Sequence, residues 1–288
     1  MTYQVLLFYK YVTIENPQEL MERVRMLATT HGLLGRCLIA EEGINGTFEG
    51  ETAATEAFLE ELLTDACFAD MPIKRSAGTG TAFPKLSVKV RNEIVGTRFP
   101  ADVDPRKQTG THITPEELRA WYEQDEDFVV IDMRNDYEFR SGHFHNSINP
   151  GLENSRDLPE KIPELLPHKD KKVVTVCTGG VRCEKMSAYL MKEGFTNVHQ
   201  LHDGMHGYME KYPGKDFDGA LYTFDNRLTM HFGGERTIVG TCHFCNAQTE
   251  QYVNCANNGC HLHFLVCDAC KGDAGTFCSE KCKQVVAV

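Results

Sequence analysis

The strongest chemical signal in the sequence is a cysteine that is followed by a short glycine-rich loop. Cys177 ends a β-branched segment and Cys183 precedes an amphipathic one, so the pattern predicts a strand, a tight loop and a helix. The loop between the two cysteines consists of Thr178, Gly179, Gly180, Val181 and Arg182. Loop amides and the helix N-terminus would converge on the Cys177 sulfur, lower the pKa of its thiol and make it a nucleophile.

The length of this loop favours a small ligand over a phosphate. Four residues separate Cys177 from Arg182, whereas cysteine phosphatases use one more residue to surround a phosphate group. The shorter loop fits a single sulfur atom, as in a persulfide. An inert cysteine is the alternative, but two glycines and an arginine are destabilising choices for plain core packing. We take Cys177, Arg182 and Cys183 as candidate catalytic residues. Cys183 would either resolve an oxidised Cys177 as a disulfide or be a helix residue without a catalytic role.

A second chemical signal is the crowding of eight of the twelve cysteines into residues 242–282. They form four pairs: Cys242 and Cys245, Cys255 and Cys260, Cys267 and Cys270, Cys278 and Cys282. These spacings predict two structural zinc sites of four cysteines each, and metal would stabilise a segment too small to fold on its own core. Free thiols, disulfides or an iron–sulfur cluster are the alternatives. The spacing leaves open which pairs share a zinc, and whether His243, His261 or His263 replaces a cysteine.

The overall charge argues against nucleic-acid binding by bulk electrostatics, but one segment departs from it. The net charge of the 288 residues is -11, whereas residues 71–110 hold eight basic residues and three acidic ones. This segment is either a solvated linker and strand face or a surface that contacts nucleic-acid phosphates. The candidate contacts are Lys74, Arg75, Lys85, Lys89 and Arg91, with Lys185 beyond the Cys177 loop.

The hydrophobic pattern divides the chain into segments of different architecture. Residues 1–95 read as β-α-β-β-α-β, which predicts a ferredoxin-like domain. After a linker at 96–112, strands alternate with helices over 113–212, which predicts an α/β domain with a parallel sheet and Cys177 at its carboxyl edge. A connector with two short strands (213–240) and the cysteine-rich tail (241–288) complete a multidomain α/β and α+β protein. No secretory signal or membrane-length apolar run is found, so we expect a cytoplasmic protein without membrane contact.

Several short motifs in residues 132–204 resemble those of rhodanese domains. They are Asp132-x-Arg134, Glu138-Phe139, Gly142-His143, Ile148-Asn149-Pro150, the Cys177 loop and Asp203-Gly204. The resemblance implies that Cys177 accepts sulfur as a persulfide. The sequence departs from the rhodanese pattern at Asn146-Ser147, where Gly-Ala is common, and at Cys183, where a small hydroxyl residue is common.

Over almost its full length the chain resembles the oxygen-dependent tRNA uridine hydroxylases. The matching features are Glu42-Gly-Ile-Asn-Gly-Thr47, which we read as a turn, the Cys177 loop and Phe224-Asp-Asn-Arg227. The resemblance implies that the protein hydroxylates C5 of the wobble uridine of tRNA, with O2 as co-substrate. No iron triad, nucleotide-binding glycine motif or haem motif is evident, so no organic cofactor is expected.

We hypothesise a reaction that uses the cysteine directly. Cys177, as thiolate or persulfide, adds to C6 of uracil; C5 becomes enolate-like and reacts with O2; elimination returns the cysteine. Arg182 and the loop amides would stabilise the developing negative charge. Among nearby residues, Asp132 and Arg134 are expected to form a structural ion pair, and Glu138 to be architectural. Glu184 and Lys185 are expected to be exposed.

Two other classes of function stay open at this point. A plain sulfurtransferase would use the same loop to move sulfane sulfur from a small donor to an acceptor thiol. A non-enzymatic adaptor would use the zinc-binding tail to hold partners. The basic segment at 71–110 favours the tRNA-modifying enzyme, because a small-molecule sulfurtransferase does not need it.

Overall fold

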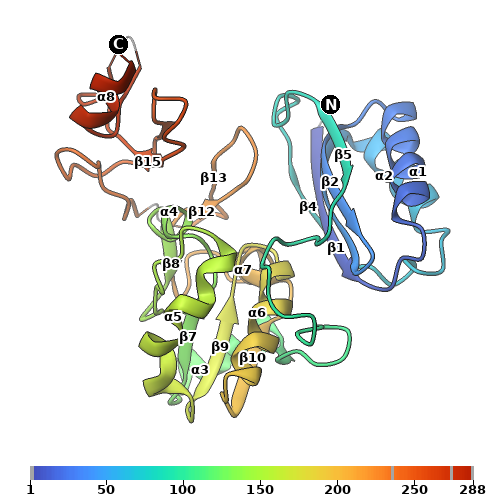
Figure 1. Ribbon diagram of the computed structural model, residues 1–288, viewed down its shortest axis with the longest axis horizontal. Helices are drawn as coiled ribbons and strands as arrows, with labels where there is room; N and C mark the ends of the chain where they lie inside the picture. The colour runs from blue at the N-terminus through green and yellow to red at the C-terminus, as the bar shows by residue number, and fades with distance from the viewer. Residues whose placement is uncertain (1–2, 235–236, 273–274, 287–288) are drawn as a thin grey trace.

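The computed structural model describes residues 3–234, 237–272 and 275–286 (Figure 1). Its first domain contains β1 (Tyr3–Tyr11), α1 (Pro17–Thr30), β2 (Leu34–Ala40), β3 (Gly43–Glu51), α2 (Thr52–Leu62), β4 (Ile73–Ala77) and β5 (Leu86–Val90). The sheet order β4-β1-β3-β2-β5 confirms the ferredoxin-like domain, with β5 added in parallel beside β2. The predicted β-α-β-β-α-β order has one strand after its second helix, whereas the structure has two, β4 and β5.

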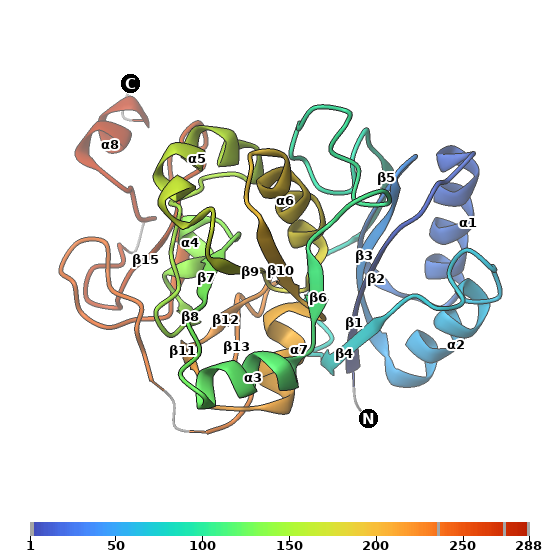
Figure 2. The same ribbon diagram turned by 90° about the horizontal axis from the view of Figure 1, so that it is seen from below.

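The two faces of this sheet have different surroundings. Alternate strand residues such as Phe8 and Phe48 pack with Phe58 of α2 in the core between the sheet and its helices. The opposite face, which we call the open face, is turned toward the second domain (Figure 2). One row of paired residues crosses it from β4 to β5: Lys74, Leu7, Thr47, Arg36 and Ser87.

Most of the segment that we read as a turn, residues 43–47, belongs to strand β3. Only Glu41 and Glu42 turn the chain, because Gly43 already pairs with Ala40 of β2 and with Tyr11 of β1. A Cβ on Gly43 would lie 2.0 Å from the carbonyl oxygen of Lys10, which explains why glycine starts this strand. The strand therefore carries its side chains alternately to the core and to the open face.

The second domain is built on a parallel sheet, as predicted. Its elements are β6 (Thr111–Ile113), α3 (Pro115–Glu123), β7 (Val129–Asp132), α4 (Asp136–Phe139), β8 (Gly142–Phe144), α5 (Leu158–Leu165), β9 (Lys172–Val176), α6 (Val181–Lys192), β10 (Asn197–Leu201) and α7 (Gly204–Lys211). The order is β6-β10-β9-β7 and each pair is parallel. The central strand β9 is apolar because both of its faces are buried. Two short 3₁₀ helices, Ser155–Asp157 and Leu166–His168, flank α5.

The remaining chain consists of the connector, which adds a strand beside β8 of the second domain, and the cysteine-rich tail. The connector has three short strands instead of the expected two: β11 (Phe217–Gly219), which pairs with β8, and the hairpin of β12 (Leu221–Tyr222) with β13 (Thr229–Met230). The tail contains β14 (Tyr252–Asn254), β15 (His263–Leu265) and α8 (Glu280–Val286). Within the described residues, no helix is long and apolar enough to cross a membrane.

Candidate functional site

The Cys177 loop has the predicted strand–loop–helix geometry. Cys177 directly follows β9, and α6 begins at Val181. The backbone N–H of Gly180 donates to the Cys177 sulfur at 3.2 Å, and the side chain is fully buried. Gly180 has a φ of +99°, a conformation that strains any residue with a Cβ. The loop thus holds the sulfur at the N-terminus of a helix.

The surroundings of the Cys177 sulfur favour the thiolate. Burial alone would raise the pKa of its thiol, but a hydrogen bond with Cys183, the charge of Arg182 and backbone N–H groups together lower the pKa to about 6. Burial and the neighbouring Cys177 raise the pKa of Cys183 well above its usual value. The two sulfurs are therefore a thiolate and a thiol at neutral pH.

Arg182 is less available than the sequence suggested. Its guanidinium donates two hydrogen bonds to the buried Glu138 carboxylate, at 2.5 and 2.9 Å. Glu138 in turn accepts from the backbone N–H of Asn135. Part of the Arg182 charge is thus neutralised, so the loop amides carry more of the stabilisation that we had assigned to this arginine. The expected ion pair of Asp132 and Arg134 is present at 2.7 Å, with both side chains fully buried.

The open face of the first domain covers the loop, and this explains the two glycines. A Cβ on Gly179 would lie 2.9 Å from the Leu7 side chain, and one on Gly180 would lie 2.7 Å from the Tyr9 hydroxyl. The Tyr9 hydroxyl donates to Glu184 at 3.2 Å, and the Tyr11 hydroxyl donates to a loop carbonyl. The Cys177 loop is therefore part of the interface between the two domains.

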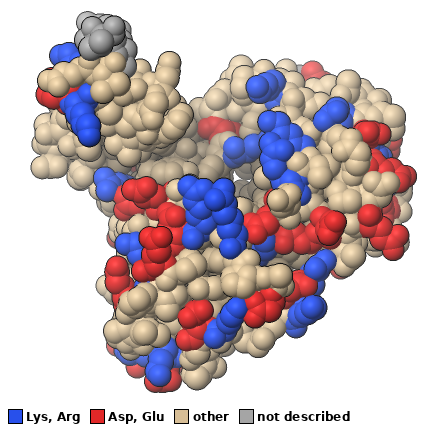
Figure 3. Space-filling model, viewed as in Figure 1, with Lys and Arg blue, Asp and Glu red and all other residues tan. Residues whose placement is uncertain are grey.

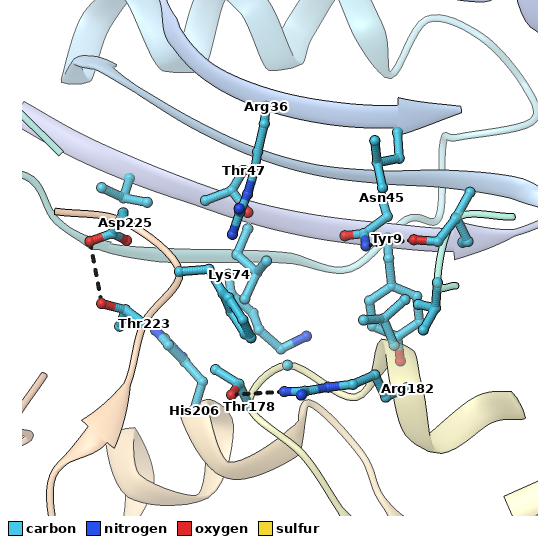
Figure 4. Close-up of a pocket in the computed structure, with 18 of the residues that line it drawn as sticks. Tyr9, Arg36, Asn45, Thr47, Lys74, Thr178, Arg182, His206, Thr223 and Asp225 are labelled. Carbon is cyan, nitrogen blue, oxygen red and sulfur yellow. Dashed lines mark hydrogen bonds between the residues drawn. The ribbon is translucent and has the colours of Figure 1, made fainter. Parts of the chain in front are cut away.

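A cavity of about 520 Å³ lies between the open face, the loop and the connector (Figure 4). Its polar and charged lining comprises Tyr9, Arg36, Asn45, Thr47, Lys74, Ser76, Ser87, Lys89, Arg91, Asn135, Ser155, Thr178, Arg182, His206, Thr223, Asp225 and Arg227. Burial lowers the pKa of His206 to about 4, so its ring is neutral. The size suits one nucleoside-sized ligand.

The basic residues that we expected to contact phosphates are dispersed by the fold. Lys89 and Arg91 line the cavity, and Lys85 is exposed outside it. Lys74 lines the cavity but is buried, with its ammonium 2.9 Å from Asp203. Arg75, the next residue along β4, lies on the other face and pairs with Glu56. Strand alternation separates these two neighbours.

The expectation that Glu184 and Lys185 are exposed is wrong. The Lys185 ammonium lies 2.8 Å from Glu42 and 3.7 Å from Glu93, and its side chain is only 5% exposed. Glu184 accepts hydrogen bonds from Tyr9 and pairs with His112 at 2.9 Å. Both residues are covered because the first domain docks on the first turn of α6. Lys185 therefore does not belong with the exposed basic residues.

Sequence reasoning missed several cavity residues. Arg36 was read only as part of a strand, yet its guanidinium lies in the cavity 5.3 Å from the Phe224 ring centre. The Arg182 guanidinium lies 5.4 Å from the same ring. Asp225 and Arg227 form an ion pair at 2.7 Å, and Arg227 also donates to Ser76 and to the Ala77 carbonyl of β4. This pair ties the connector to the first domain.

Three cavity cations have no carboxylate partner among the described residues. They are Arg36, Lys89 and Arg91. Within the described part of the chain, the only hydrogen bond made by these three side chains runs from Arg91 to the neighbouring Val90 carbonyl, while Arg36 lies over the Phe224 ring and within the field of Asp225. Lys and Arg side chains gather beside the hollow between the two domains (Figure 3). We call these three residues the cationic rim, and unpaired cations of this kind attract an anionic ligand.

The tail cysteines form two groups of four, and the grouping shows which pairs would share a metal ion. Alternate pairs share a group: Cys242, Cys245, Cys267 and Cys270 in one, and Cys255, Cys260, Cys278 and Cys282 in the other. The sulfur atoms within each group lie within 4.8 Å of one another, and tetrahedral zinc–thiolate sites need about 3.8 Å. The donor set thus fits a metal ion. Neither group includes a histidine from the described residues: His263 contacts Asn254 and Tyr222, and His243 contacts the Cys278 carbonyl.

Family comparisons divide the chain into three matched regions. Residues 3–94 match a family described as UPF0176 acylphosphatase like domain, 114–211 match the rhodanese-like domain, and 218–283 match the family described as rhodanase C-terminal. Similar solved structures include a rhodanese-like domain protein from Staphylococcus aureus (26% identity, TM-score 0.30, covering 34% of this chain and 90% of that one). An acylphosphatase from Bacillus subtilis is also similar (16% identity, TM-score 0.25, covering 30% of this chain and 98% of that one).

Full-length relatives carry a functional name. Proteins from Staphylococcus aureus strains bovine RF122 / ET3-1 and MSSA476 are each called tRNA uridine(34) hydroxylase. Each is 43% identical to this chain over 288 residues, which covers 99% of this chain and 90% of the relative. The similarity thus includes the first domain, the Cys177 loop, the connector and the tail.

Proposed function

The chain belongs to the tRNA uridine(34) hydroxylase family, and on that premise we propose that it hydroxylates C5 of the wobble uridine of tRNA with O2. The observation that carries the proposal is the placement of the Cys177 loop at a cavity that also holds the cationic rim. Cys177 itself is buried, but its loop lines a nucleoside-sized cavity through Thr178, Gly179, Val181 and Arg182. Such a cavity with unpaired cations at its edge suits a single nucleotide of an RNA loop. A reaction on tRNA also agrees with our expectation of a cytoplasmic protein.

The substrate would enter as an unstacked base. A wobble nucleotide lies in the single-stranded anticodon loop, so turning its base into a pocket costs little pairing energy. Arg36, Lys89 and Arg91 would neutralise the adjacent phosphates. Lys85 lies outside the cavity and would at most steer the tRNA, whereas the paired Lys74, Arg75 and Lys185 would not contact phosphate.

Cys177 would act as the nucleophile of the reaction. Its thiolate adds to C6 of uracil, the resulting enolate reacts at C5 with O2, and loss of the C5 proton with elimination of Cys177 restores the ring. The Gly180 N–H and the helix N-terminus stabilise the thiolate before addition and after elimination. Glu138 holds Arg182 in place, so the arginine shapes the loop and lowers the thiol pKa at the same time.

The oxygen balance requires a source of electrons. One atom of O2 enters the C5–H bond and the other becomes water, which takes two electrons and two protons. Addition of O2 leaves a hydroperoxide on C5. After Cys177 is eliminated from C6, its thiolate would attack the outer peroxide oxygen, which gives 5-hydroxyuracil and a Cys177 sulfenic acid. The Cys183 thiol would then condense with the sulfenic acid to a disulfide and water, and an external thiol would reduce the disulfide. A Cys183→Ser enzyme would then lose turnover while still binding tRNA. Full turnover by this variant would make Cys183 a helix residue only.

A sulfurtransferase reaction is the second candidate. The specific observation in its favour is the hydrogen bond from Gly180 to the Cys177 sulfur, since a loop of backbone amides also suits a persulfide. The unpaired cationic rim argues for the larger substrate, because a small sulfur donor does not reach it. We also propose that the two four-cysteine groups bind structural zinc.

The test of the proposed function is the nucleoside content of tRNA from cells with and without this gene. After growth with air, mass spectrometry should find less 5-hydroxyuridine and less of its derivatives in the mutant than in cells with the gene. After growth without air, the two strains should not differ. An unchanged amount in aerated mutant cells would overturn the proposal, unless a second enzyme that works without this gene is present. Deleting the gene in a strain that lacks such an enzyme removes that alternative.

A further inference from the structure

The open face presents one amide group whose orientation is fixed by the protein. Asn45 lies on β3 and lines the cavity, and its Nδ2 donates to the carbonyl oxygen of Ile94 at 3.1 Å. An asparagine amide can be turned over, and a bond of this kind decides which way it faces. Among the described residues, no other hydrogen bond involves the Asn45 amide, so its oxygen and the second N–H of Nδ2 can bind a ligand in the cavity (Figure 4).

The carbonyl that fixes Asn45 is itself held in place. The backbone N–H of Ile94 donates to Glu42 at 2.8 Å, and the other Glu42 oxygen pairs with the buried Lys185 ammonium at 2.8 Å. Lys185 stands in the first turn of α6, just after the Cys177 loop. The amide orientation is thus connected to the catalytic loop through a continuous set of hydrogen bonds and one ion pair.

The free groups of Asn45 match one edge of uracil. Uracil carries an N3–H donor beside its O4 acceptor, and an amide with a free oxygen and a free N–H pairs with both. Cytosine presents the reverse, an N3 acceptor beside an N4 amino donor. An amide that turns over to suit cytosine would point its oxygen at the Ile94 carbonyl and lose that bond.

We propose that Asn45 is the residue that selects uracil over cytosine, through paired hydrogen bonds to N3–H and O4. The inference rests on the proposed function, because it names how the same cavity recognises its base. Asn45 would be a specificity-determining residue and not a participant in the bond-making steps. The segment Glu42–Thr47, which we read from the sequence only as a turn, would then contain both Asn45, which recognises the base, and Glu42, which holds the Asn45 amide in place through Ile94.

The position of Asn45 on the sheet agrees with this role. It pairs in register with Tyr9, whose hydroxyl meets the Gly180 backbone of the catalytic loop. In the other direction, Lys89 lies two strands away in the same row, which is about 10 Å at the usual strand spacing. A nucleotide can therefore set its base against Asn45 near the loop and its phosphates against the cationic rim.

The first test measures binding without chemistry, in a Cys177→Ala protein. Anticodon stem-loops with uridine or cytidine at the target position are compared by fluorescence anisotropy. We expect uridine to bind at least about fivefold more tightly, and this preference to disappear when Asn45→Ala or Asn45→Asp is added. Asn197→Ala, a change at an exposed residue outside the cavity, should keep it. A preference that survives both Asn45 variants would overturn the proposal.

The second test changes the ligand, so its first comparison does not depend on how the Asn45 variants fold. A stem-loop with N3-methyluridine lacks the N3–H donor, so the Cys177→Ala protein should bind it at least about fivefold more weakly than uridine. After Asn45→Ala, the methyl group should make little further difference, since the partner is gone. Equal methyl effects in both proteins would contradict the inference. Failure of the proposed function looks different, because a wild-type protein with uracil preference would then make no hydroxylated product.

Discussion

The buried Lys185 ammonium lies 2.8 Å from the Glu42 carboxylate and joins the two domains beside the Cys177 loop. Lys185 belongs to the first turn of α6, and Glu42 to the turn that leads into β3. The same interface contains Tyr9 with Glu184, and Arg227 with β4. The Cys177 loop is therefore held from both domains, which makes its geometry a property of the interface.

Loss of this ion pair should destabilise the protein. Lys185→Met leaves the largely covered Glu42 carboxylate without its ion-pair partner, so the free energy of unfolding should fall by about 3 kcal/mol. Lys192→Met is the matched control, because Lys192 pairs with Asp102 in solvent and should cost less than about 1 kcal/mol. Urea unfolding of both variants checks the prediction, and equal losses would contradict it.

The activity should depend on pH through Cys177. With a thiol pKa of about 6, kcat/KM should rise about tenfold per pH unit below that value and level off above it. Arg182→Gln removes a charge that lowers the pKa, so the midpoint should move up, whereas Arg182→Lys should keep it closer to the wild type. A midpoint that stays in place in Arg182→Gln would show that the arginine does not act on the thiol.

The lowered pKa of Cys177 also makes the free energy of unfolding depend on pH. Because the folded pKa of Cys177 lies below that of an unfolded thiol, the thiolate stabilises the folded state fully above the unfolded pKa. That contribution is lost as the pH falls through about 6. As the pH falls through this range, the difference in unfolding free energy between the wild type and Cys177→Ser should become smaller. A difference that does not change with pH would contradict the prediction.

Removing one positive charge from the cationic rim should weaken tRNA binding and make the affinity less dependent on salt concentration. Arg36→Ala, Lys89→Ala and Arg91→Ala should each reduce the slope of log affinity against log salt by about 1. Arg75→Ala is the control, because Arg75 lies on the opposite side of the sheet and pairs with Glu56. Filter binding over a salt series measures the slopes. A loss with Arg75→Ala as large as with Arg36→Ala would mean that the tRNA lies elsewhere.

The two cysteine groups of the tail should each bind one zinc ion. In a Cys245→Ser protein, Cys267 and Cys270 should become reactive toward alkylation while Cys255 and Cys260 stay protected, because alternate pairs share a group. Cys67→Ser should leave both metals bound. Mass spectrometry of alkylated peptides and metal analysis measure these effects, and early reaction of Cys255 and Cys260 would indicate pairing of neighbouring pairs.

Local patterns were enough to predict the architecture and the loop. The strand before Cys177, the glycines and the following helix are encoded within a dozen or so residues, and the two sheets follow from the period of the apolar residues. The eight tail cysteines were predicted as metal ligands by their spacing alone. Their grouping was not predictable, because it depends on how the tail folds back on itself.

The residue positions that we did not predict from the sequence depend on contacts between segments that are far apart in the chain. Nothing near Lys185 in the sequence indicates that Glu42 covers it, and nothing near Arg36 indicates that Phe224 lies beside it. The basic segment at 71–110 was counted as one surface, although β4 sends Lys74 and Arg75 to opposite faces. Closer attention to strand alternation would have separated these two residues, whereas the docking of the open face on the loop needed the structure.

We propose that Cys177 is the nucleophile of an O2-dependent hydroxylation of tRNA. The most direct measurement uses purified protein, unmodified tRNA, a thiol reductant and isotopically heavy O2, with mass spectrometry of the nucleosides. We predict that the wild type forms 5-hydroxyuridine containing the heavy oxygen, and that Cys177→Ala forms none although it still binds tRNA. Labelled 5-hydroxyuridine produced by Cys177→Ala at the wild-type rate would contradict this account.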